Sequence, residues 1–194
     1  GRRTKRRPSV SCWTKRDALR SDVGFSPRQD DWILNTFDLK IAAGAKGCLV
    51  DTSIWVEVLR SSRHRLPDHP VTPVVHELTE ADLIYTSRLI IAELIAGARN
   101  RREAHRLEQD FEGYRFCSED LGLFRDAGYT RRSYMHAFRR GPAPGLIDCY
   151  LVNLAKRENL IVFTADKPLQ SVAEFQRVKG IFFSIQSRQL SFVT

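Results

Sequence analysis

The chain has 194 residues, a formal net charge of +8 and 42% hydrophobic residues, a normal apolar content for a globular protein. This length fits one domain with a substantial core. No run approaches the roughly 18 apolar residues of a transmembrane helix, and the basic start is not followed by an apolar signal segment. We therefore predict a cytoplasmic protein without a membrane partner. The four cysteines form no C-x-x-C pair, which argues against a zinc site or disulfide framework, and Cys48 and Cys149 are expected to be buried.

The excess positive charge lies at the beginning of the chain. Residues 1–28 hold nine basic and two acidic residues, a net charge of +7, whereas the remainder holds 22 basic and 21 acidic residues. We predict that residues 1–46 form a basic, flexible extension, in which residues 32–41 could dock as a short helix or strand. Residues 47–194 are predicted to form one domain that does not need the extension for its chemistry.

Apolar runs alternate with helical patterns from Gly47 onwards. The expected strands are 48–50, 83–85, 116–117, 160–164 and 181–185. The expected helices are 54–60, part of 72–78, 87–100, 101–114, 118–127, 129–139, 146–157 and 167–175. Strands that alternate with helices indicate an α/β fold with a mainly parallel sheet.

Four acidic residues occupy positions that ordinary solvent-facing charge does not explain. Asp51 and Asp166 directly follow apolar strands, so both are expected at the carboxyl edge of the sheet, where α/β proteins bind ligands. Glu93 shares an apolar helix face without a basic neighbour, and Asp148 lies in a helix that is apolar nearly all round. Taken singly, each acid could be a cap or the partner of a distant arginine. Together they predict one pocket for Mg²⁺ or Mn²⁺, ions that prefer oxygen ligands, with Asp51 and Asp148 innermost.

The motifs that carry these acids resemble, in order and spacing, those of PIN-domain ribonucleases, in particular the VapC toxins of toxin–antitoxin pairs. The motifs are LVDTSIW (49–55), IAELIAG (91–97), LID (146–148) and FTAD (163–166). The resemblance implies a PIN-like three-layer fold, with helices flanking the central sheet. It also implies a Mg²⁺- or Mn²⁺-dependent endoribonuclease that leaves 5′-phosphate and 3′-hydroxyl ends, with Asp51, Glu93, Asp148 and Asp166 as catalytic metal ligands. A cognate antitoxin and a homodimer are further implications.

Residues around the predicted pocket have more than one possible role. Ser53 and Thr164 could orient water or phosphate, or could cap the following helix or turn. Two arginine clusters could bind RNA phosphates, or could be solvated helix faces: Arg99, Arg101, Arg102 and Arg131, Arg132, Arg139, Arg140. Two other functions also fit the sequence. One is a PIN nuclease in RNA processing, and the other is a non-catalytic domain that binds RNA or a protein partner.

Overall fold

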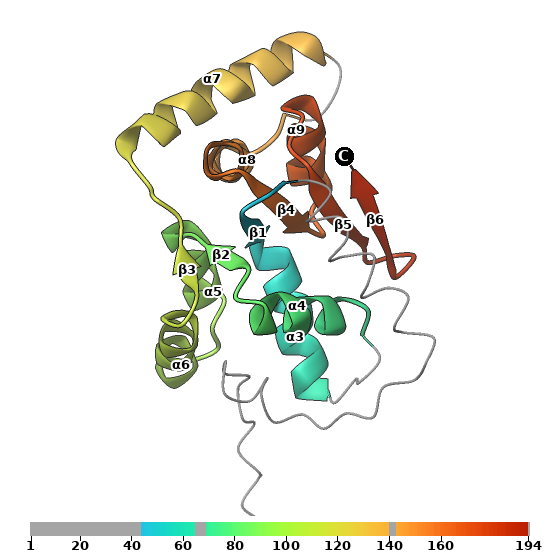
Figure 1. Cartoon of the computed structure of the whole chain (residues 1–194). Coiled ribbons are helices and arrows are strands. Elements are labelled where there is room, and N and C mark those ends of the chain that lie inside the picture. Colours follow the sequence, from blue (N-terminus) through green and yellow to red (C-terminus); the bar gives the residue numbers. More distant parts are fainter. Residues whose placement is uncertain (1–43, 65–68, 140–142, 194) are drawn as a thin grey trace, which may run out of the picture.

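The computed structural model describes residues 44–64, 69–139 and 143–193 of the chain (Figure 1). The predictions for residues 1–43, including the docking segment 32–41, concern residues outside this part. Arg140 also lies outside it.

A six-stranded sheet forms the centre of the molecule, in the order β3-β2-β1-β4-β5-β6. The strands are β1 (Gly47–Val50), β2 (Ile84–Thr86), β3 (Arg115–Phe116), β4 (Leu160–Thr164), β5 (Gly180–Ser184) and β6 (Gln189–Val193). All neighbouring strands are parallel except β5 and β6. The predicted α/β fold with a mainly parallel sheet is confirmed. Strand β6 was not predicted. Its five residues alternate between polar and apolar side chains, but this pattern is too short to indicate a strand without the antiparallel pairing with β5.

Helices cover both faces of this sheet, which confirms the three-layer arrangement. They are α3 (Thr52–His64), α4 (Val71–Glu80), α5 (Arg88–Ala96), α6 (Arg101–Phe111), α7 (Leu121–Ala137), α8 (Leu146–Glu158) and α9 (Lys167–Phe175). Figure 1 shows α8 and α9 on one face, α3 and α4 on the other, and α7 outermost, above α8. Among the described helices, none is long and apolar enough to cross a membrane.

Several helix boundaries differ from the prediction, and two of them have a clear physical reason. Helix α7 runs through Gly128, where a break was expected, because packing against α8 outweighs the roughly 1 kcal/mol that an interior glycine costs. The contacts include the rings of Phe124 and Tyr150, whose centroids are 4.6 Å apart. Helix α5 ends at Ala96 rather than near Asn100, because the Asn100 side chain accepts a hydrogen bond from the Glu103 N–H and begins α6.

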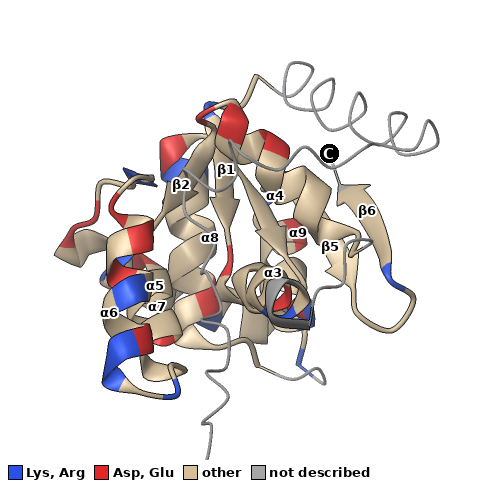
Figure 2. Cartoon of the chain, turned by 90° about the horizontal axis from the view of Figure 1, so that it is seen from below, with Lys and Arg blue, Asp and Glu red and all other residues tan. Residues whose placement is uncertain are grey.

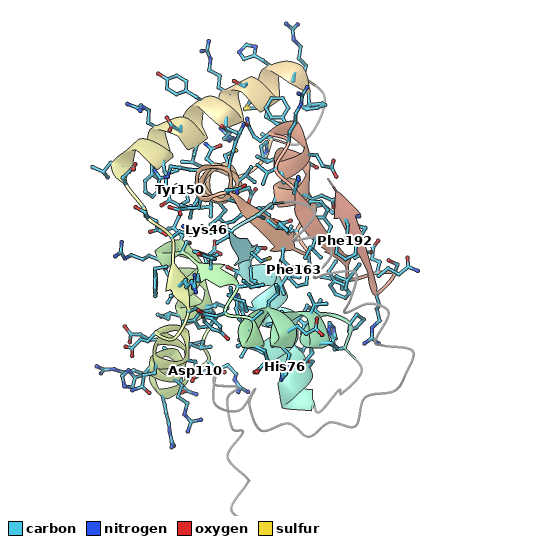
Figure 3. The ribbon with its side chains drawn as sticks, viewed as in Figure 1. Lys46, His76, Asp110, Tyr150, Phe163 and Phe192 are labelled. Atoms are coloured by element: carbon cyan, nitrogen blue, oxygen red, sulfur yellow. The ribbon has the colours of Figure 1, made fainter. Side chains whose placement is uncertain are left out.

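The core fixes the carboxyl edge of the sheet. Every residue of β1 and β4 is buried, as expected for central parallel strands covered on both faces. Phe163 of β4 lies in the middle of the molecule, between the helical layers (Figure 3). Because Val50 pairs with Phe163, the next residues along the chain, Asp51 after β1 and Thr164 at the end of β4, become neighbours. The backbone N–H of Asp51 donates to the Phe163 carbonyl at 2.9 Å.

The described cysteines belong to this packing. Cys48, Cys117 and Cys149 are buried and form no disulfide. Burial raises the pKa of the Cys117 thiol to about 12 and that of Cys149 to about 11, so neither is a thiolate near neutral pH. The prediction that Cys48 and Cys149 are buried is confirmed.

Candidate metal centre

Asp51 is held in place by two hydroxyl groups. It is 7% exposed at the end of β1, and its Oδ2 accepts hydrogen bonds from Ser53 Oγ at 2.6 Å and Thr164 Oγ1 at 2.8 Å. The same hydroxyls accept from backbone N–H groups, Ser53 from Ala165 and Thr164 from Asp166, both at 2.9 Å. These bonds join the loop after β1 to the loop after β4. Both hydroxyls are therefore placed to orient the Asp51 carboxylate, a role that the sequence had not suggested.

Glu93 lies at the exposed rim of the site. The buried positions of α5 are Ile90 and Leu94, so the expectation that Glu93 projects from a core face is wrong. Its Oε2 accepts a 2.5 Å hydrogen bond from the Thr52 hydroxyl, which brings α5 to the beginning of α3. The sequence analysis did not include Thr52 among the site residues. Its position between Asp51 and Ser53, in the first turn of α3, could have indicated that it lies at the same site.

Asp148 and Asp166 are half-buried at the beginnings of two helices. The Asp148 Oδ2 accepts a hydrogen bond from the Gly145 N–H at 2.8 Å and so caps α8. Burial, and then the charge of Asp51, raise the pKa of Asp148 despite that bond. Asp166 begins α9 without a side-chain capping bond, and burial raises its pKa, followed by the charges of Asp148, Asp51 and Glu93. Asp51 and Asp166 follow the neighbouring strands β1 and β4, and the Glu93 carboxylate bonds to Thr52, the residue after Asp51, so these three acids lie at the carboxyl edge of the sheet.

The four carboxylates have no cationic partner among the described residues. Within that part of the chain, no Lys, Arg or His forms a salt bridge with any of them. Acids elsewhere behave differently: Glu158, for example, lies 3.0 Å from the ammonium group of Lys46. An unpaired group of acids at this edge leaves a deficit of positive charge that a bound cation would correct.

The donor chemistry fits a hard divalent cation, although the side chains do not form a closed site. In residues 44–64, 69–139 and 143–193, no three His, Cys, Asp or Glu side chains are arranged to hold a metal ion. Asp51, Glu93 and Asp148 each use one carboxylate oxygen in a protein hydrogen bond, and within these ranges the second oxygen has none. Carboxylate oxygens suit Mg²⁺ and Mn²⁺.

The two predicted arginine clusters differ in their surroundings. Arg131 lies at the rim of the site, where its Nε donates to the Pro144 carbonyl at 3.0 Å, just before α8. Arg132 and Arg139 are exposed at α7 and directly after it. Arg99 instead pairs with Glu103 at 3.1 Å, and basic and acidic residues alternate along α6, where Arg101 and Arg102 lie (Figure 2).

The fold and the site define an α/β protein with carboxylates gathered at the carboxyl edge of its central sheet. A model of the PIN domain matches residues 48–175, and the chain belongs to this family, whose members are generally nucleases that use divalent metals. A comparison with curated proteins gave no match.

Two solved structures are similar to this chain. FitAB bound to an IR36 DNA fragment is 22% identical, with a TM-score of 0.51, covering 70% of this chain and 94% of that one. FitAcB from Neisseria gonorrhoeae is 23% identical, with a TM-score of 0.47, covering 66% of this chain and 93% of that one. At 22% identity the similarity to FitAB bound to DNA concerns the fold alone.

Proposed function

We propose that the protein is a Mg²⁺- or Mn²⁺-dependent endoribonuclease with Asp51, Glu93, Asp148 and Asp166 as its metal-binding catalytic residues. The observation that carries the proposal is that Asp51, Glu93 and Asp148 each keep one carboxylate oxygen without a protein hydrogen bond, while none of the four acids has a salt bridge to a described residue. Like charges this close together are costly unless a counter-charge joins them. Because this repulsion between carboxylates destabilises the metal-free protein, the group of acids indicates a bound cation with a functional role.

The chain's own residues prepare this edge for phosphodiester hydrolysis. A divalent cation, when bound, would neutralise charge on the phosphate and lower the pKa of water. Ser53 and Thr164 fix Asp51 through one oxygen and leave the other for the cation. Helices α3, α8 and α9 all begin at this edge, so their N-terminal dipoles add positive potential where an RNA phosphate would lie.

We further propose that this nuclease is the toxin of a toxin–antitoxin pair, active in the cytoplasm as a homodimer and inhibited by a cognate antitoxin. The support is the order and spacing of the four acidic motifs, which resemble VapC toxins. Residues 1–46 are proposed to be an extension that adds non-specific affinity for nucleic acid and is not needed for cleavage. A role in RNA processing is the second candidate. An antitoxin gene directly upstream, whose product co-purifies with the protein, would favour the toxin.

Cleavage of RNA by the purified protein should depend on metal and on Asp51. Wild-type protein with Mg²⁺ or Mn²⁺ should cleave a mixed RNA substrate, and excess EDTA should stop the reaction. Asp51→Asn should reduce the cleavage rate by at least about 100-fold, because it removes an inner ligand worth several kcal/mol. Gel electrophoresis of end-labelled RNA provides the measurement, and Glu80→Gln, an exposed acid at the end of α4, is the matched control. Metal-dependent RNA binding without cleavage would instead support the non-catalytic alternative.

A further inference from the structure

The outward face of α7 carries a stripe of cations with an aromatic residue among them. Arg125, Tyr129, Arg132 and His136 lie within a sector of about 60° at 100° per residue, and they extend over about 16 Å of helix. This sector is roughly opposite the buried Leu123, Ala127 and Thr130. The Arg125 side chain is 71% exposed and Tyr129 is 62% exposed. These four residues, with Arg139 directly after the helix, are called the α7 stripe below.

Few acids neutralise the α7 stripe. Asp126 is the one acidic residue between positions 121 and 139, and it lies 3.5 Å from Arg125. No salt bridge to a described residue involves Arg132 or Arg139. Helix α6 is different, because its three arginines are balanced by Glu103, Glu108 and Asp110. Positive potential is therefore concentrated on α7 rather than shared between the two helices.

The α7 stripe continues to the candidate metal centre. Arg132 follows Arg131, whose guanidinium contacts the Pro144 carbonyl next to Gly145, the residue that donates to Asp148. An open depression of about 550 Å³ lies along the end of the helix and connects Arg131 with the stripe. Its lining residues are Gly128, Arg131, Arg132, Met135, His136 and Arg139. A chain bound at the acids would meet these side chains as it leaves the site.

We propose that the α7 stripe binds the backbone of single-stranded RNA outside the cleavage site, with arginines on phosphates and Tyr129 stacked on a base. This inference rests on the proposed ribonuclease function and adds a substrate-binding surface to it. Cations with an interleaved aromatic suit an unpaired strand, because phosphates supply regular negative charge and every base offers a face for stacking. Helix α7 also exposes Leu121, Phe124 and Met135, but at 100° per residue these lie along one flank of the stripe, whereas the arginines and Tyr129 occupy the centre of the outward face.

The salt dependence of RNA binding tests this proposal. Fluorescence anisotropy with a 5′-fluorescein-labelled 20-mer of uridine, in EDTA to prevent hydrolysis, gives Kd between 50 and 200 mM KCl. The full-length triple variant Arg125→Gln/Arg132→Gln/Arg139→Gln should lower the slope of log Kd against log salt by about 2, at roughly 0.7 per lost phosphate contact. The matched control, Arg99→Gln/Arg101→Gln/Arg102→Gln, removes the same charge from α6 and its approach and should leave the slope nearly unchanged.

Variants of Tyr129 provide a second, independent test of the RNA-binding proposal. Tyr129→Ala should weaken binding about tenfold, whereas Tyr129→Phe should retain the wild-type Kd, because stacking needs the ring and not the hydroxyl. Equal slopes for both triple variants, or no loss with Tyr129→Ala, would overturn the α7 stripe even if the wild type cleaves RNA. Weaker binding by the α7 variants alone would support the stripe even if no cleavage is found, so the two proposals fail separately.

Discussion

Replacing Asp148 with Asn should reduce RNA cleavage by at least about 100-fold while leaving the protein folded. The change removes one of the two carboxylates expected to lie innermost around the cation. The amide oxygen of Asn can still accept the Gly145 N–H, which Asp148 now holds at 2.8 Å, so the cap of α8 is preserved. Loss of chemistry without loss of fold is the expected signature of a ligand rather than a structural residue.

The Asp148→Asn variant should lose activity but should not lose stability when no metal is present. Burial and neighbouring carboxylates raise the pKa values of Asp148 and Asp166 in the folded state, so the folded protein holds these protons more tightly than the unfolded chain. Their contribution to stability is therefore greatest at low pH and is lost as the pH rises through the raised pKa values. In EDTA at neutral pH, the melting temperature of Asp148→Asn should equal or slightly exceed that of the wild type.

Melting curves in EDTA and in Mn²⁺, recorded between pH 4 and pH 8, provide the test. Mn²⁺ should stabilise the wild type at neutral pH by mass action and should stabilise the variant much less. A variant that is several degrees less stable than the wild type in EDTA would mean that the Asp148 carboxylate is required by the fold rather than by a cation.

The second large effect is expected from Thr164→Val, which removes a hydroxyl while keeping the shape of the side chain. Thr164 is 0% exposed, donates to Asp51 and accepts from the Asp166 N–H. The valine leaves the Asp166 N–H without its bond and removes one of the two hydroxyls that donate to Asp51, which should cost about 1–3 kcal/mol of unfolding free energy. The melting temperature should fall by several degrees, and cleavage should fall because Ser53 is the one hydroxyl that still orients Asp51.

Thr130→Val separates these two consequences. Thr130 is also buried, and its hydroxyl bonds to Asn153 between α7 and α8, away from the acids. It should lower stability by a similar amount and leave the cleavage rate of the folded protein unchanged. Equal losses of activity in the two variants would show that the Thr164 hydroxyl contributes to stability alone.

Sequence patterns predicted the parts of the fold that depend on local chemistry. The continuous apolar runs of β1 and β4 indicated buried parallel strands, and their ends placed Asp51 and Asp166 at one edge of the sheet. Asp148 was expected in the same pocket because it lies in a helix that is apolar nearly all round. These features could be predicted because each depends on a pattern within a few neighbouring residues.

Other parts depend on contacts between segments far apart in the chain. Strand β6 exists only as the partner of β5, and α7 stays continuous through Gly128 only because α8 supports it. The exposure of Glu93 and its bond to Thr52 depend on how α5 crosses the beginning of α3. The bonds from Ser53 and Thr164 to Asp51 follow from the register between β1 and β4, which no single segment encodes.

The most direct test of the proposed metal centre is whether the four acids together bind one divalent cation. Isothermal titration of Mn²⁺ into the metal-free protein should show saturable binding, and Asp51→Asn, Glu93→Gln, Asp148→Asn and Asp166→Asn should each weaken it. The two inner variants should weaken it most, by roughly tenfold or more, and Asp126→Asn should have no effect. If the wild type binds no Mn²⁺, or if the four variants bind it as tightly as the wild type, these carboxylates are not a metal centre.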